Sequence, residues 1–92
     1  MENQPAHSSR ISVYASDTNQ VLSRILQVFG KSRFEVSYMQ VFHTGDEHLK
    51  RIVVEAAFPQ EMMTLILARI EKIIEVHRAF AHAGDDADPI GF

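Results

Sequence analysis

Cysteine is absent from this chain of 92 residues, which excludes disulfides, thiolate nucleophiles and sulfur-ligated metal centres. The same absence is compatible with a reducing compartment. Long apolar runs are also missing: none approaches the ~18 residues that a membrane-spanning helix needs, and the polar amino terminus has no apolar core of a signal peptide. We therefore expect a soluble, cytoplasmic protein.

A basic surface is the next feature that the sequence lacks. The formal net charge is −3, and only two small basic clusters stand out, Lys31 with Arg33 and Lys50 with Arg51. Proteins that bind nucleic acid normally carry a basic face or stripe. The charge balance therefore argues against nucleic acid as a partner.

Catalytic constellations are missing as well. The serines have no matching histidine and carboxylate arrangement, and there is no glycine-rich phosphate loop. His43 and His48 flank a turn and could approach each other, but no third metal ligand is fixed by spacing, so solvated turn histidines are the simpler interpretation. Glu71 and Glu75 could form an acid and base couple, yet a solvated helix end explains them better. We expect no catalytic activity and no metal site.

The first ordered segments follow from the spacing of apolar residues. Residues 10–16 alternate between apolar and polar side chains, as in a half-buried strand. Asp17 opens a polar turn, after which apolar residues recur at three- and four-residue spacing, a pattern that predicts an amphipathic helix ending near Gly30 and Lys31. The stripe of that helix consists of Val21, Leu22, Ile25, Val28 and Phe29.

The rest of the chain repeats this alternation of element types. Residues 34–43 predict a second strand, with a bulge near Tyr38 and Met39 where the alternation changes phase. A hairpin loop with Gly45 and Asp46 leads into a third strand at residues 49–58. Pro59 suits the first turn of a second helix, and residues 74–81 predict a fourth strand. The apolar stripe of the second helix consists of Met62, Met63, Ile66, Ile70 and Ile73.

This element order predicts an α+β fold of the ferredoxin-like βαββαβ type. Two helices cover one face of a four-stranded antiparallel sheet, with the first and third strands at the centre. We expect a flexible leader at residues 1–9, the domain at 10–81 and an acidic, disordered tail at 82–92. The second face of the sheet, with Tyr14 and Val53, has no cover, and both sheet edges are unpaired. These features predict a homodimer.

RNA-recognition motifs share this order of strands and helices, so RNA binding has to be weighed. Such modules stack bases on exposed aromatic residues of their two central strands. Here the third strand reads KRIVVEAAF and the first strand offers only Tyr14. The sequence therefore disfavours that interpretation.

Three segments carry a family resemblance over residues 10–81. These segments, ISVYASDTNQVLSRILQVFGKSRFEVSYMQV, RIVVEAAF and ARIEKIIEVHRAF, resemble the ACT domain, most closely that of the regulatory small subunits of acetohydroxyacid synthase, also called acetolactate synthase. The order and spacing of the segments carry the resemblance, since no single motif is decisive. The resemblance is to a short small subunit with one ACT unit, or to a stand-alone ACT protein.

The resemblance implies a regulatory chain without an active site of its own. Its expected partner is the large catalytic subunit of the synthase, which would hold thiamine diphosphate, Mg and FAD and acts in branched-chain amino acid biosynthesis. Many small subunits also transmit feedback inhibition by valine. The competing expectation is a stand-alone ACT protein that senses an amino acid and needs no synthase partner.

The effector site of the family lies at a dimer interface, between the loop that enters the first helix and the start of the second strand. A helix start attracts the carboxylate of an amino acid, and a polar side chain opposite can take its ammonium group. The matching positions of this chain are Asp17, Thr18, Asn19, Gln20, Val21, Leu22, Glu35 and Val36.

Three positions depart from the family pattern. Gln20 and Arg33 stand where glycine is usual, and Glu35 replaces the usual asparagine. Gln20 adds a side chain where the ligand carboxylate approaches the backbone, and Glu35 offers only an anionic acceptor. Gln20 also has a structural explanation, because with Asp17 as N-cap it could complete a capping box. We therefore expect valine binding to be weak or absent.

Overall fold

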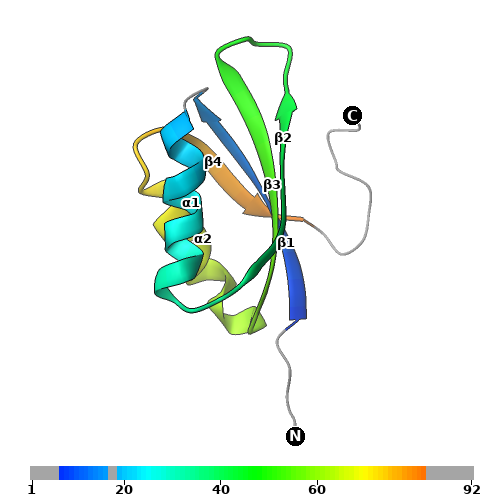
Figure 1. The fold of residues 1–92 in the computed structure, drawn as a ribbon, viewed down its shortest axis with the longest axis vertical. Helices are drawn as coiled ribbons and strands as arrows, with labels where there is room; N and C mark the ends of the chain where they lie inside the picture. Colours follow the sequence, from blue (N-terminus) through cyan, green and yellow to red (C-terminus); the bar gives the residue numbers. More distant parts are fainter. Residues whose placement is uncertain (1–6, 17–18, 83–92) are drawn as a thin grey trace, which may run out of the picture.

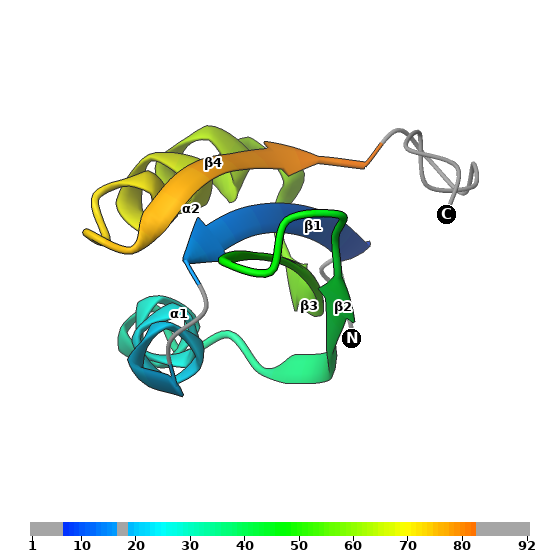
Figure 2. The same ribbon diagram turned by 90° about the horizontal axis from the view of Figure 1, so that it is seen from above.

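A four-stranded antiparallel sheet with two helices on one face forms the domain (Figures 1 and 2). The computed structural model describes residues 7–16 and 19–82. The strand order β2-β3-β1-β4 places the first and third strands at the centre, which confirms the predicted ferredoxin-like topology. The elements are β1 (His7–Ser16), α1 (Asn19–Lys31), β2 (Val36–His43), β3 (Leu49–Phe58), the short 3-10 helix η1 (Gln60–Met62), α2 (Met63–Glu71) and β4 (Val76–Ala81).

The core lies between the sheet and the two helices. Alternate residues of β1 and β3 point into it, while α1 and α2 add one apolar stripe each. Phe58 anchors an aromatic group, with its ring centroid 6.2 Å from that of Phe29 and 5.7 Å from that of Phe34. The predicted inward faces are confirmed at the fully buried side chains of Ile11, Val13, Ala15, Ile25, Phe29, Ile52, Val54, Ile66 and Ile70.

The first strand begins at His7, three residues earlier than the alternation predicted. Ser8 and Ser9 pair with Ala57 and Ala56 of β3 through the backbone, and such pairing leaves no apolar signature in the sequence. At the other end of the chain, the backbone N–H of His82 donates to the carbonyl of Arg10 at 2.9 Å. Residue 82 therefore still contacts β1, and the predicted boundary at residues 81 and 82 stays a prediction. Residues 83–92 lie outside the described part of the chain.

The second strand contains the predicted irregularity, one residue earlier than expected. Val36 pairs with Ala56 and Tyr38 with Glu55, so Ser37 is the extra residue of a bulge. Its hydroxyl donates to the backbone carbonyl of Glu55 at 3.2 Å. The strand begins at Val36 rather than at residue 34, because the Phe34 N–H bonds to the Phe29 carbonyl in the turn that closes α1.

The turn before the last strand is also longer than predicted. β4 begins at Val76 rather than at residue 74, and the N–H of Val76 closes the turn on the carbonyl of Ile73 at 3.0 Å. Ile74 lies in this turn and is 89% exposed. Pro59 precedes η1 with φ −61°, so the second helical segment begins with a 3-10 turn.

The open face of the sheet is better packed than predicted. Val53 is only 5% exposed and Ser12 is fully buried, so the expectation that Val53 lies on an uncovered, solvent-exposed face was wrong. Large side chains in the neighbouring rows explain this result: the Arg51 guanidinium lies 4.6 Å from the Phe42 ring centroid, and Tyr14 stacks on Phe80 at 6.0 Å.

His82 also contributes to this face. Its Nε2 forms a hydrogen bond with the Ser12 hydroxyl. Burial, with the positive charges of Arg10 and Arg51 nearby, lowers the pKa of His82 below its ordinary value. The folded chain therefore favours the neutral imidazole at this contact.

Among the described helices, none is long and apolar enough to cross a membrane.

Candidate functional site

The start of α1 forms one half of the predicted effector site. A small cavity of about 100 Å³ lies beside it, between the helix and the ends of β1, β2 and β3. The first helical turn holds no acidic side chain, so the partial positive charge of the helix dipole is not neutralised from within that turn. An anionic group is the ligand that such a helix start accepts. The cavity is lined by Ser16, Asn19, Val21, Leu22, Val41, Lys50 and Ile52.

The other predicted half, Glu35 and Val36, lies at the opposite end of α1. The N–H of Phe34 donates to the carbonyl of Phe29 at 2.9 Å, which ties the entry of β2 to the last turn of the helix. Thirteen helical residues span about 20 Å. One chain therefore does not bring the two halves of the predicted site together.

The helix start carries the departures from the family pattern on its surface. Asn19 and Gln20 are exposed, Val21 is buried and Leu22 is half-buried. The carbonyl of Gln20 accepts a hydrogen bond from the Ser23 hydroxyl at 3.1 Å, as an ordinary helical residue does. Asp17 and Thr18 lie outside the described residues, so the capping box between Asp17 and Gln20 stays a prediction.

The other residues weighed for chemistry have separate structural roles. Glu71 accepts a hydrogen bond from the backbone N–H of Ala79 at 3.0 Å, and Glu75 pairs with Arg24 at 3.2 Å. His77 is exposed and contacts the Ser16 hydroxyl at 3.1 Å. Within residues 7–16 and 19–82, no group of three histidine or acidic side chains could hold a metal ion.

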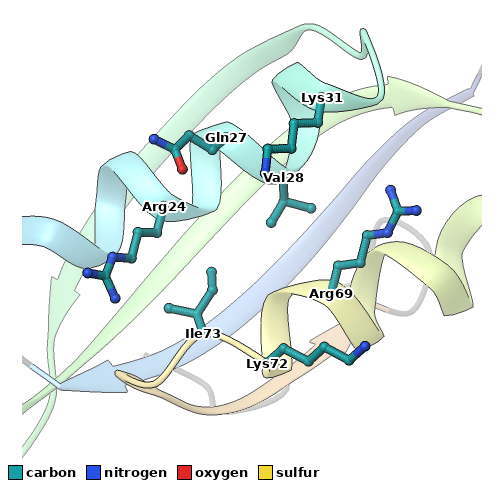
Figure 3. Close-up of a pocket in the computed structure, with 7 residues that line it drawn as sticks. All are labelled: Arg24, Gln27, Val28, Lys31, Arg69, Lys72 and Ile73. Atoms are coloured by element: carbon teal, nitrogen blue, oxygen red, sulfur yellow. The ribbon is translucent and has the colours of Figure 1, made fainter.

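Sequence reasoning missed a basic groove between the two helices (Figure 3). The groove encloses about 630 Å³, and four cationic side chains surround an apolar floor of Val28 and Ile73: two come from α1, one from α2 and one from the residue that caps α2. The signal was present as an i, i+7 spacing of cations on α1 and an i, i+3 spacing at the end of α2, where Lys72 is the C-cap residue. Sequence alone does not show that the two helices present these cations to the same groove. The cations are Arg24, Lys31, Arg69 and Lys72, and Gln27 completes the lining.

A comparison with models of known protein families identifies the family of this chain. A model of the ACT domain matches residues 17–79. The chain belongs to the ACT domain family. No curated protein sequence matches it significantly.

Solved structures of ACT and other domains share this fold at low sequence identity. The small subunit of acetolactate synthase from Thermotoga maritima superimposes with a TM-score of 0.72 at 17% identity, over 82% of this chain and 47% of that one. The C-terminal domain of the MgtC protein from Mycobacterium tuberculosis gives 0.70 at 13%, over 97% and 99%. The ACT domain of GTP pyrophosphokinase from Chlorobium tepidum gives 0.67 at 12%, over 84% and 99%. This ACT chain spans about half the length of the synthase small subunit.

Proposed function

We propose that this ACT chain is a non-catalytic regulatory subunit that binds and activates the catalytic subunit of acetohydroxyacid synthase. The partner would carry thiamine diphosphate, Mg and FAD. The sequence resemblance over residues 10–81 supports the assignment, as does the fold shared with the small subunit from Thermotoga maritima. Activation would arise if the chain binds an active conformation of its partner more tightly than an inactive one.

The observation that carries a regulatory role is the division of the effector site between the two ends of α1. In a two-fold antiparallel pairing of β2 with β2 of a second copy, the start of one strand lies beside the end of the other. Val41, near the end of β2, lines the cavity at the start of α1. Glu35 of a second copy would therefore approach the start of α1 across the interface and complete the site.

The two sheet edges differ in a way that favours β2 as this interface. The β4 edge is partly satisfied within the chain, because the Ala79 N–H donates to the Glu71 carboxylate. β2 is the other edge of the sheet, and Tyr38 and Val41 on it are 41% and 40% exposed. An unprotected edge is the ordinary place for strand addition. We therefore propose a homodimer through β2.

Activation and valine binding can be tested separately. We expect the purified chain to raise the activity of a synthase catalytic subunit from the same organism. We also expect calorimetry to detect no sub-millimolar valine binding, because Gln20 crowds the helix start and Glu35 repels a carboxylate. The paired substitutions Gln20→Gly and Glu35→Asn should restore binding to the dimer. Sub-millimolar binding of valine by the unmodified chain, with loss of holoenzyme activity, would contradict the weak-feedback proposal.

The competing function is a stand-alone amino-acid sensor. The cavity at the start of α1 is the observation that favours it, since that cavity could accept a carboxylate without any synthase partner. A sensor would bind a free amino acid tightly and leave the synthase unaffected. The same two measurements therefore separate the two functions.

A further inference from the structure

Three of the four cations around the helix groove have no acidic partner among the described residues. Arg24 pairs with Glu75, whereas Arg69 donates only to the Ser32 hydroxyl at 3.3 Å. Among the described residues, Lys31, Arg69 and Lys72 form no ion pair. Positive charge gathered in this way favours an anionic occupant.

The groove is positive in a chain that is negative overall. All nine lysine and arginine residues lie in the described part, which holds seven of the twelve acidic residues. The described part therefore has a formal charge of +2, against −3 for the whole chain. Three unpaired cations at one groove are a local concentration of charge that the overall composition conceals.

An apolar surface accompanies these charges. Val28 and Ile73 are half-buried and point into the space between the helices (Figure 3). Ile74, the next residue along the chain, is 89% exposed and is not one of the residues that line the groove. Apolar surface ringed by cations fits an occupant that is both acidic and apolar.

The layout of the cations decides between a compact anion and an extended one. Their charged ends stand apart around the rim, on α1 and at the end of α2, rather than converging on one point (Figure 3). A single phosphate would reach few of them, whereas carboxylates spaced along a peptide reach both sides. We propose that this groove binds an acidic segment of a partner protein, with an apolar side chain of that segment packed on Val28 and Ile73. The identity of this partner, the catalytic subunit, rests on the proposed function, whereas the docking site itself does not.

The first experiment maps the groove with a defined probe. A short synthetic peptide that alternates glutamate and leucine is titrated into the full-length, ¹⁵N-labelled chain. We expect saturable amide shifts gathered at Val28, Lys31, Lys72, Ile73 and Ile74. A peptide with lysine in place of glutamate should produce none of them, and inorganic triphosphate should bind at least about tenfold more weakly than the acidic peptide.

A matched pair of charge reversals tests the residues. Lys72→Glu, at the groove, should weaken peptide binding by about three- to tenfold, as expected for one partly desolvated ion pair. Arg78→Glu, on the open face of the sheet, changes the net charge equally and should leave binding unchanged. Both side chains are exposed, and amide spectra of the free variants check that each is folded.

Four results would overturn the proposal. These are peptide shifts on another surface, equal weakening by both reversals, triphosphate binding in the groove more tightly than the peptide, and groove shifts caused by deleting residues 83–92. The last would assign the groove to the chain's own acidic segment. In the synthase assay, Lys72→Glu should lower the affinity for the catalytic subunit. If peptide binds in the groove but the unmodified chain does not bind the synthase, the proposed function fails and the docking site stands.

Discussion

At the scale of single residues, Arg33 occupies a backbone position whose conformation favours glycine. Its φ is 62°, in the left-handed region that favours glycine. The N–H groups of Arg33 and Phe34 donate to the carbonyls of Gly30 and Phe29, a Schellman motif that closes α1. The family resemblance places glycine here, and the backbone shows the physical reason for it.

Replacing Arg33 with glycine should stabilise the chain. Arg33→Gly removes a left-handed penalty of about 1–2 kcal/mol, part of which is offset by the greater freedom of glycine in the unfolded chain. We expect a net gain of about 1 kcal/mol and a rise in Tm of about 4–8 °C in calorimetry. The control Lys31→Gly, two residues earlier and at the last helical position, should lower Tm. A fall in Tm for both variants would contradict this explanation.

At the same scale, Gln20 shows how far sequence reasoning reaches into the site. The apolar stripe from Val21 onward predicted where α1 lies, and the structure begins the helix at Asn19, whereas the predicted cap at Asp17 lies outside the described residues. The family pattern grouped Gln20 with Glu35, which one chain holds at opposite ends of a helix of about 20 Å. A sequence pattern shows which positions belong to a site. It does not show that these positions would come from two copies of the chain in a symmetric dimer.

At the scale of elements, the predictions succeeded where side-chain periodicity carries the signal. The bounds of β3 and the end of α1 are as predicted, since α1 buries one apolar stripe and β3 has buried residues over most of its length. The start of β1 and the turn at Ile74 were misplaced for the opposite reason. Backbone pairing of Ser8 and Ser9 extends the strand without apolar residues, and Ile74 is apolar but exposed.

Glu71 links α2 to the edge of the sheet and should contribute measurably to stability. Its carboxylate accepts a hydrogen bond from the N–H of Ala79, a residue only 7% exposed. Glu71→Ala leaves that donor unsatisfied, so we expect a loss of about 1–2 kcal/mol in urea unfolding. Glu61→Ala, at an exposed residue of η1, is the matched control and should change stability little. Equal losses in both variants would show that the contact is not a stabilising one.

At the scale of the whole molecule, this small ACT domain presents two surfaces that its own fold leaves unused. The β2 edge is open to strand addition, and the groove between α1 and α2 carries unpaired positive charge. They lie on different elements, so a dimer through β2 leaves the groove accessible to another protein. A regulatory subunit needs this arrangement if it is to hold an effector between its copies and still contact a partner.

The absence of cysteine makes the proposed dimer directly testable. Single substitutions Gln40→Cys and His43→Cys put one thiol near the middle or at the end of β2. If a two-fold axis passes the middle of the strand, copies of residue 40 lie close together, whereas copies of residue 43 lie about 20 Å apart. A disulfide requires Cα atoms within about 7 Å, so only Gln40→Cys should cross-link efficiently under mild oxidation. His77→Cys, on the β4 edge, is the control; its cross-linking in place of Gln40→Cys would move the interface to β4, and a stable monomer by light scattering would refute the dimer.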